Sequence, residues 1–175
     1  MKSYREALSL IRLIPDFPKP GILLQDITPL LSDGEAFTAI ISKIATCSPD
    51  VDFVAGVEAR GFIFAAAVAN SLGVGFIPIR KSGKLPTHSI SRSYGLEYGN
   101  SVLEVHRDAF PQGSRILLID DILATGGTIS ASIELIEELD GVILDVAFIS
   151  EIEELDGYRV IKERYPAIEI HILSR

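Results

Sequence analysis

The segment from Ile116 to Thr128 reads ILLIDDILATGGT, and it constrains the fold more than any other part of the 175-residue chain. It begins with an apolar run suited to a central strand that is buried on both faces. Two carboxylates, Asp120 and Asp121, follow this run, and a turn of small residues then opens a helical stretch. This order is typical of an α/β protein with a parallel sheet, in which ligands bind beyond the carboxyl ends of the strands.

The small-residue turn carries the groups that bind phosphate. It consists of Ala124, Thr125, Gly126, Gly127 and Thr128, whose backbone N–H groups and hydroxyls would lie at a helix N-terminus. Two acids beside such a turn suit a ligand with both hydroxyls and phosphate, such as a ribose phosphate. Mg²⁺ fits the same site, because it prefers oxygen ligands and phosphates.

Two other interpretations of this segment are possible from its residues alone. An apolar run that ends in two aspartates also occurs in nucleotide triphosphatases, but that interpretation requires a GxxxxGK[ST] motif, which the chain lacks. A Gly-Gly turn alone is more often a mere helix start. The order of acids, hydroxyls and glycines is therefore what indicates a ligand site.

The alternation of short apolar runs and helical stretches continues along the chain. It predicts a parallel sheet with crossover helices in one domain over residues 1–175. Strands are expected at Asp52–Val57, Val74–Ile79, Val102–His106, Ile116–Ile119, Val142–Ile149 and Ile168–Leu173, and helices at Ser3–Leu13, Gly34–Thr46, Phe62–Leu72, Ile129–Leu139 and Leu155–Arg164.

Two segments break this alternation. Residues 14–31 combine prolines with apolar residues, which predicts an ordered and partly buried loop. Residues 82–100 are polar and rich in Gly, Ser and Thr, and a loop of this length indicates a functional or mobile segment.

Charge limits the classes of partner. The chain has 16 basic and 24 acidic residues, a net charge of −8, which argues against nucleic acid and anionic membranes as partners. The range Glu134–Glu169 holds eleven acids and three bases, so the remainder is neutral. Within that remainder, Arg80–Arg107 carries five bases and two acids. We therefore expect a solvated acidic surface and a separate site for an anionic small molecule.

Cysteine content and the N-terminus indicate the compartment. Cys47 is the only cysteine, so no internal disulfide can form. The first ten residues lack the apolar core of a signal peptide, and no apolar stretch reaches the roughly 18 residues of a membrane span. We expect a cytoplasmic protein with no membrane partner.

Several segments, in order along the chain, resemble the type I phosphoribosyltransferases. ILLIDDILATGGT is similar to their phosphoribosyl pyrophosphate motif, and IPDFPKPGILLQDITPLL at residues 14–31 resembles the N-terminal signature of the members that act on adenine. VEARGF at residues 57–62, RKSGKLP at 80–86 and YGLEYG at 94–99 are similar as well. The resemblance implies a mostly parallel twisted sheet flanked by helices, with a small N-terminal hood formed by about residues 14–31.

The resemblance also implies a reaction for purine salvage. Adenine and 5-phosphoribosyl 1-pyrophosphate would give AMP and pyrophosphate with Mg²⁺, in a homodimer. Two alternatives stay open: a related enzyme for hypoxanthine, guanine or xanthine, and a non-enzymatic regulator that binds phosphoribosyl pyrophosphate or a purine. Such a regulator would need an appended DNA-binding domain or a basic face, and neither is visible in the sequence.

The family supplies roles for the matching residues. Asp120 and Asp121 would face the ribose hydroxyls, and residues 124–128 would hold the 5′-phosphate. Glu97 would act as general acid or base near the purine N7, in a mobile loop over about residues 82–100. The turn that begins at Glu58 would contact pyrophosphate, often with a cis Glu58–Ala59 peptide bond. The other candidates are Arg60, Arg80, Lys81, Lys84 and His88 for pyrophosphate, Leu23, Leu24 and Gln25 for the purine, and Tyr98 beside Glu97 as a further substrate-binding residue.

Some of these candidates have simpler interpretations. The basic residues also fit a solvated charge run, His88 an incidental loop histidine, and residues 22–24 a piece of core. The family has an aromatic residue at the position of Leu24 and an arginine at that of Gln25. Leu24 can still pack on a purine, and the backbone of Leu23 can read the adenine edge. The helices predicted at Ser3–Leu13 and Phe62–Leu72 are candidates for the subunit interface.

Overall fold

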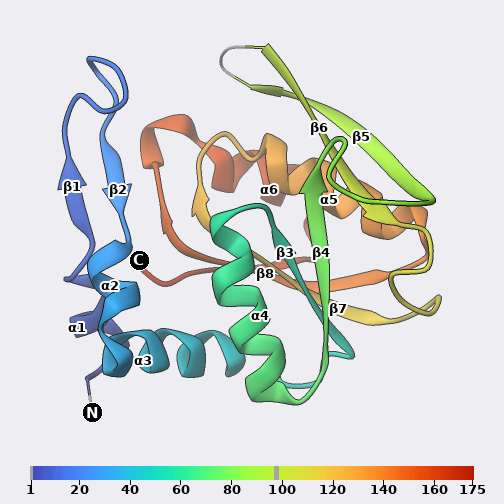
Figure 1. Cartoon of the computed structure of the whole chain (residues 1–175), viewed down its shortest axis with the longest axis horizontal. Coiled ribbons are helices and arrows are strands. Elements are labelled where there is room, and N and C mark those ends of the chain that lie inside the picture. Colours follow the sequence, from blue (N-terminus) through green and yellow to red (C-terminus); the bar gives the residue numbers. More distant parts are fainter. Residues whose placement is uncertain (1, 97–98) are drawn as a thin grey trace.

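The computed structural model describes residues 2–96 and 99–175, so the candidates Glu97 and Tyr98 lie outside the described residues. A seven-stranded sheet forms the centre, in the order β5-β6-β4-β3-β7-β8-β9 (Figure 1). Five strands are parallel, and the other two extend the sheet as an antiparallel hairpin. The strands are β3 (Phe53–Val57), β4 (Gly75–Lys81), β5 (Ser89–Leu96), β6 (Gly99–His106), β7 (Arg115–Leu123), β8 (Val142–Glu151) and β9 (Glu169–Ile172). The prediction of a mostly parallel α/β sheet is confirmed.

Helices cover both faces of this sheet. One face carries α1 (Tyr4–Leu8), α2 (Thr28–Ser32), α3 (Gly34–Ala45) and α4 (Arg60–Leu72), and the other carries α5 (Gly127–Glu138) and α6 (Gly157–Arg164), which follows the 3₁₀ turn η1 (Glu153–Leu155). A hydrophobic cluster fills the space on each side. Among the described residues, no helix is both long and apolar enough to cross a membrane.

Strand β7 lies at the centre of the core, as its apolar run predicts. Ile116 and Leu118 belong to the cluster beneath α5 and α6, whereas Leu117 and Ile119 belong to the opposite cluster. All four side chains are fully buried. Alternate residues of this strand therefore face opposite layers of the molecule.

The order of the strands reverses beside β7. From β3 the chain crosses to β4 on one side, and β7 pairs with β3 on the other side. Parallel sheets bind ligands at such a switch point, beyond the carboxyl ends of the strands. The residues that follow β3 and those at the end of β7 therefore meet at the edge where a site is expected.

The N-terminal segment differs from its predicted form. A capping box of Ser3 and Glu6 starts α1, but the helix ends at Leu8 and does not reach Leu13. The chain instead forms β1 (Arg12–Ile14), which pairs with β2 (Leu24–Asp26). An ion pair of 2.7 Å between Arg12 Nη2 and Asp26 Oδ2 joins the two strands. Pairing with a distant strand thus overrides the helical period, and the two strands form a small separate sheet.

The polar segment over residues 82–100 is not a loop throughout. Its part from Ser89 to Leu96 is strand β5, which pairs with β6. Ile90 is buried and Tyr94 packs on the core, whereas Ser91 and Ser93 are exposed. Ser91 and Ser93 occupy the outward positions of a two-residue repeat, and such small polar residues make the composition resemble that of a loop.

A polar contact joins the segment that follows α3 to the sheet edge. Asp145 of β8 accepts a hydrogen bond from Ser48, and its Oδ1 lies 2.8 Å from His171 Nε2 in β9. A hydrogen bond with Cys47, and then the contact with Asp145, raise the pKa of His171 to about 9. The imidazole is therefore charged at neutral pH in the folded protein.

We expect this histidine to make stability depend on pH. A raised folded-state pKa stabilises the fold fully below the ordinary value of 6.5, and this stabilisation is lost as the pH rises towards 9. The Tm should fall by a few °C between pH 6.5 and 9, since about 1 kcal/mol corresponds to roughly 2–4 °C at this chain length. Thermal melts of His171→Gln should show a flatter profile, and His106→Gln should keep the wild-type slope. Equal slopes in all three proteins would contradict this.

Candidate active site

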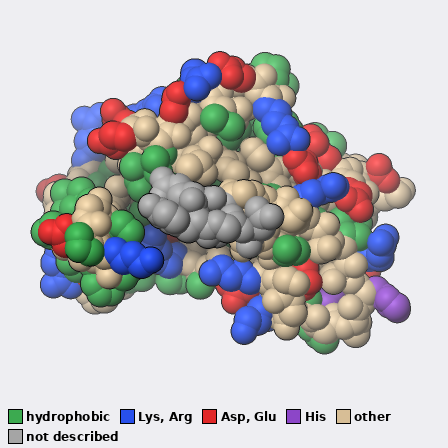
Figure 2. All heavy atoms as spheres, turned by 90° about the horizontal axis from the view of Figure 1, so that it is seen from above, with side chains coloured by type: hydrophobic (Ala, Val, Ile, Leu, Met, Phe, Trp, Pro, Cys, Tyr) green, Lys and Arg blue, Asp and Glu red, His purple; other side chains and the backbone are tan. Residues whose placement is uncertain are grey.

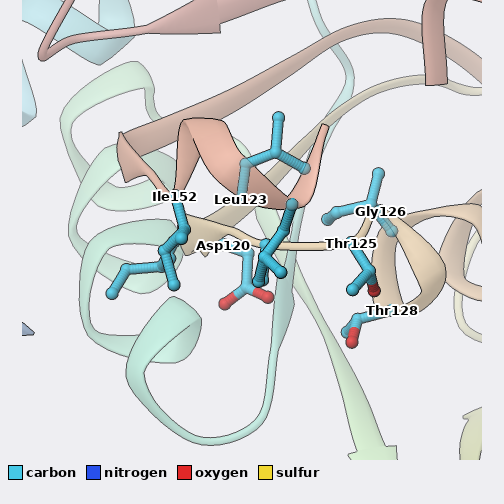
Figure 3. Close-up of a pocket in the computed structure, with 10 residues that line it drawn as sticks. Asp120, Leu123, Thr125, Gly126, Thr128 and Ile152 are labelled. Atoms are coloured by element: carbon cyan, nitrogen blue, oxygen red, sulfur yellow. The ribbon is translucent and has the colours of Figure 1, made fainter. Parts of the chain in front are cut away.

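The two acids of the phosphate-binding motif lie within β7 and not beyond its end. The strand continues through them to Leu123 in register with β8, whereas its pairing with β3 stops at Ile119. Since alternate residues face opposite layers, the two carboxylates separate. Asp120 lines a cavity on the α5 side (Figure 3), and Asp121 is buried, with 6% of its surface exposed. The sequence predicts the pair but not this division.

Asp121 binds the first residue of α4. Its Oδ2 lies 2.7 Å from Nε of Arg60. The same guanidinium donates from Nη1 to the carbonyl of Gln25 at 3.1 Å, and the Gln25 side chain donates to the carbonyl of Glu151 at 3.4 Å. This chain of contacts connects the sheet, the turn after β3 and the N-terminal hairpin.

Burial controls the protonation of both acids. Burial, and then the negative charge of Asp121, raise the pKa of Asp120 well above its ordinary value. Burial also raises the pKa of Asp121, while Arg60 acts in the opposite direction. The ionised form of each carboxyl is therefore disfavoured in the free site. A cation, or a ligand atom that gains positive charge, would be stabilised beside Asp120.

The turn after β7 has the geometry of a phosphate site. Gly126 adopts a left-handed conformation with φ of +83° and precedes the first residue of α5. The Gly127 N–H donates to the Thr125 hydroxyl at 3.5 Å. Thr125, Gly126 and Thr128 line the same cavity as Asp120 (Figure 3). An acid and a helix N-terminus thus face one space, which is the arrangement predicted for a ribose phosphate.

The cavity also has an apolar wall, which the sequence analysis missed. The volume of the cavity is about 380 Å³, within the range of small-molecule sites. Besides Asp120 and the turn, the lining consists of Ile122, Leu123, Ile129, Ile152 and Leu155. Ile152 and Leu155 follow the end of β8 directly, so their place after a parallel strand is the signal that could have found them. An apolar wall opposite polar groups suits a flat heterocyclic base.

The turn after β3 contains the Glu58–Ala59 peptide bond, which is cis, as the resemblance implies. Glu58 accepts hydrogen bonds from Arg80 Nε at 3.2 Å and from the Lys81 backbone at 3.0 Å. The Arg80 guanidinium holds the pKa of Glu58 below its ordinary value. The ends of β3 and β4 are therefore joined by ionic hydrogen bonds at the edge of the site.

The predicted basic residues are not equivalent. Arg80 binds Glu58 and also donates to the carbonyl of Lys84 at 2.8 Å, so N–H groups of its guanidinium already bind acceptors within the protein. The side chains of Lys81, Lys84 and His88 are exposed. Within the described part of the chain, no carboxylate oxygen lies within 4 Å of the Lys81 or Lys84 ammonium. Figure 2 shows Lys, Arg, Asp and Glu side chains interspersed on the face of the hairpins.

Gly61 ends the turn that the resemblance assigns to pyrophosphate, and it lies against the acid pair. A Cβ atom at this position would lie 2.9 Å from Asp120 Oδ1 and 3.0 Å from the Ile119 carbonyl. The first turn of α4 therefore contacts β7 at the acid pair, and only glycine permits this approach.

The N-terminal hairpin places its candidates unequally. Leu24 and Gln25 are half-buried in β2, whereas Leu23 is 51% exposed. Gln25 is bound to Arg60 and Glu151, as described above. The interpretation of residues 22–24 as core is wrong for Ile22 and Leu23, which are exposed.

Comparison with known proteins identifies relatives over most of the chain. Residues 28–156 match the model of the phosphoribosyl transferase domain family. An adenine phosphoribosyltransferase of Halothermothrix orenii is 52% identical over 163 residues, which cover 89% of this chain and 96% of that protein. One from Chloroflexus aurantiacus is 49% identical over 162 residues, with 91% and 94% covered.

Solved structures agree with these sequence matches. The adenine phosphoribosyltransferase of Thermoanaerobacter pseudethanolicus superposes with a TM-score of 0.91 at 45% identity, covering 98% of both chains. The enzyme of Saccharomyces cerevisiae, in complex with an imino-altritol bisphosphate and adenine, gives a TM-score of 0.88 at 34% identity, with 97% of both chains covered.

Proposed function

Because the chain belongs to the phosphoribosyltransferase family, among the adenine phosphoribosyltransferases, we infer that it transfers a phosphoribosyl group to adenine for purine salvage. Adenine and 5-phosphoribosyl 1-pyrophosphate react to AMP and pyrophosphate, which makes the protein a pentosyltransferase. The observation that carries this function is the cavity of about 380 Å³, in which Asp120, the phosphate turn and an apolar wall face one another.

The ribose phosphate occupies the part of the cavity beside Asp120. The backbone of residues 124–128 and the hydroxyls of Thr125 and Thr128 bind the 5′-phosphate at the start of α5. The ribose carbon gains positive charge as pyrophosphate leaves, and the carboxylate of Asp120 stabilises that charge. Asp121 holds Arg60 at the same edge, at 2.7 Å.

Pyrophosphate binds at the ends of β3 and β4. The backbone of Glu58 and Ala59 and the guanidinium of Arg60 contact it, Lys81 and Lys84 add cationic groups at and after the end of β4, and His88 adds an imidazole. Arg80 orders the turn through Glu58, with 3.2 Å between Nε and Oε2, so we place it in support of the site. Lys81 and Lys84 are assigned to pyrophosphate because no carboxylate oxygen of the described residues lies within 4 Å of their ammonium groups. Arg60 is assigned by the family resemblance, although it also binds Asp121.

Adenine lies between the hood and the apolar wall. Leu24 packs on one face of the purine, the backbone of Leu23 reads its edge, and Ile152 and Leu155 form the opposite wall. Gln25 fixes strand β2 to the sheet through the Glu151 carbonyl. Glu97 transfers the proton of the base, and Tyr98 lies beside it in sequence.

Magnesium accompanies phosphoribosyl pyrophosphate in this proposal. The described residues contain no group of three or more His, Cys, Asp or Glu side chains that could hold a metal ion by themselves. Asp120 offers a hard oxygen donor in the cavity, whereas Asp121 is buried against Arg60, so Mg²⁺ would be held mainly through the substrate pyrophosphate and ribose. When bound, Mg²⁺ neutralises charge on the pyrophosphate group.

The homodimer and the cytoplasmic location stay predictions. A basic residue near Lys84 or His88 would reach the site of the second subunit. Sedimentation of the purified protein tests the dimer, and a monomer at all concentrations would contradict it.

A panel of bases tests the reaction. The enzyme is incubated with phosphoribosyl pyrophosphate, Mg²⁺ and, in turn, adenine, hypoxanthine, guanine and xanthine, and the nucleotide product is identified. We expect AMP from adenine and little product from the other three. No AMP would refute the proposal, and product from another base would favour a related purine enzyme. Binding of phosphoribosyl pyrophosphate without any product would favour the regulator.

The hood position that departs from the family offers a second test. Leu24→Phe should lower the KM for adenine about 5-fold, because stacking of a base on an aromatic ring contributes at least roughly 1 kcal/mol. The KM for phosphoribosyl pyrophosphate should stay unchanged. As a control, Leu13→Phe adds a ring to an exposed residue of β1, and it should leave both constants unchanged. Equal adenine KM values for wild type and Leu24→Phe would remove Leu24 from the base site.

A further inference from the structure

Gly157, the first residue of α6, lies against the phosphate turn, although 28 residues separate it from Thr128 in sequence. A Cβ atom at Gly157 would lie 2.1 Å from the Ala124 carbonyl oxygen and 3.0 Å from both Ala124 C and Gly126 N. These are backbone atoms of the turn itself, so no side-chain rotation can relieve the overlap. No other glycine of the described chain has a contact as short as 2.1 Å.

The contact is reciprocal. A Cβ atom at Gly126 would lie 3.2 Å from the Gly157 carbonyl oxygen and 3.3 Å from Cγ1 of Ile161. Gly126 has φ of +83°, which leaves glycine as the favoured residue there for a second reason. Two backbones thus approach each other closely because both positions lack a side chain.

Helix α6 is fixed in this place from several sides. Ile161 is fully buried in the core beneath α5. Arg164 pairs with Glu134 of α5, and the Tyr165 hydroxyl lies 3.5 Å from the Ser130 carbonyl. The helix that begins at Gly157 is therefore packed against the helix that begins at the phosphate turn, and the turn lies at the junction of the two.

We propose that Gly157 is a positioning residue for the 5′-phosphate turn, because its backbone contact with Ala124 and Gly126 sets the direction of the turn's N–H groups. This inference rests on the proposed function of residues 124–128. Hydrogen bonds to a phosphate weaken steeply when the N–H group is misdirected, so a small displacement of Gly126 N reduces phosphate affinity. Gly157 itself does not touch the substrate.

Substitution by alanine isolates this effect. At the start of a helix, Gly→Ala is neutral or stabilising on intrinsic grounds, so a loss must come from the contact with the turn. Gly34 is a matched control, since it is also the first residue of a helix, and nothing lies within 4 Å of a Cβ atom there. Gly34→Ala should behave as wild type in every assay.

The readout is the preference for AMP over adenosine, which differ by the 5′-phosphate. Calorimetry gives the Kd of both ligands for wild type, Gly157→Ala and Gly34→Ala. For Gly157→Ala we expect the Kd of AMP to rise about 10-fold, which corresponds to about 1.4 kcal/mol, while the Kd of adenosine stays unchanged. The ratio of the adenosine Kd to the AMP Kd therefore falls about 10-fold. The KM for phosphoribosyl pyrophosphate should rise by a similar factor with little change in kcat. A general loss of stability would lower the binding of both ligands equally.

An unchanged AMP-to-adenosine ratio in folded Gly157→Ala would overturn the proposal. If that variant does not fold, Ile161→Val replaces it, because it removes packing beneath Gly126 without a steric overlap. If the adenosine-to-AMP Kd ratio of Ile161→Val is lower than that of wild type by about 3-fold or more, the proposal is supported, and an unchanged ratio overturns it. The base panel on the wild-type enzyme tests the reaction separately, so failure of the proposed function and failure of the role of Gly157 are distinguishable.

Discussion

Asp120→Asn should lower kcat/KM for phosphoribosyl pyrophosphate about 10²-fold, the loss typical of removing one preorganised electrostatic group. The carboxylate lines the cavity beside the phosphate turn, where positive charge develops on the ribose carbon. The amide keeps the shape and can still accept the Asp121 N–H at Oδ1, which lies 2.9 Å away in the wild-type protein. Steady-state kinetics with varied phosphoribosyl pyrophosphate measure the effect.

The control for this variant is Asp140→Asn. Asp140 has a left-handed backbone that asparagine tolerates, and its carboxylate binds Gln112 at the surface. This substitution should leave kcat/KM within about 2-fold of wild type, since substitutions at the surface, away from the cavity and the core, have small effects. Full activity of Asp120→Asn would exclude a charge role for Asp120.

The same carboxylate should determine the acidic limb of the pH profile. Because burial raises the pKa of Asp120 well above its ordinary value of 3.8, kcat/KM should fall as the pH falls through this raised value. The ionised form is the active one, so activity is retained above the limb and lost below it. Asp120→Asn should abolish the limb, and persistence of the limb in this variant would assign it to another group.

Glu97→Gln should lower kcat about 10²-fold or more, because proton transfer by a positioned side chain typically contributes roughly 10²-fold to 10⁴-fold. The prediction rests on the match of residues 94–99 to the family motif, since Glu97 lies outside the described residues. One group gives the proton in one direction and takes it in the other. AMP formation and the reverse reaction with pyrophosphate should therefore decrease by the same factor.

Two further measurements make the test of Glu97 specific. Glu97→Asp should restore part of the lost kcat, because it returns a carboxylate to the segment. The KM for phosphoribosyl pyrophosphate should change little in Glu97→Gln, since the residue acts on the base. An unchanged turnover number in Glu97→Gln would remove Glu97 from the mechanism.

The sequence determined the central part of this protein because the apolar run that predicts the buried strand is followed directly by the acids and the turn that predict the ligand site. The apolar run from Ile116 to Ile119 has to be buried, and buried parallel strands bring their following residues to one edge of the sheet. The acids and the small-residue turn needed only their order to indicate a phosphate site. The cis peptide at Glu58–Ala59 could be expected only from the family, since no local pattern encodes it.

Local pattern failed where distant partners decide the conformation. Arg12–Ile14 forms a strand because Leu24–Asp26 pairs with it, although the preceding residues continue a helical period. The polar residues of Ser89–Leu96 form a strand because β6 pairs with it and Ile90 is buried. In both cases the hydrogen bonds come from residues that a local window does not contain.

By itself, the sequence thus determined the parallel strands of the sheet, the acid pair and the phosphate turn. Only the tertiary structure decided that Asp120 faces the cavity while Asp121 faces Arg60. The side chains of β7 point alternately to the two faces of the sheet, and the fold decides what covers each face. It also brought Ile152, Leu155 and Gly157 to the site from the acidic range Glu134–Glu169, where charge alone indicated only a solvated surface. Their contribution is shape and close approach, which depend on what lies opposite each residue in the fold.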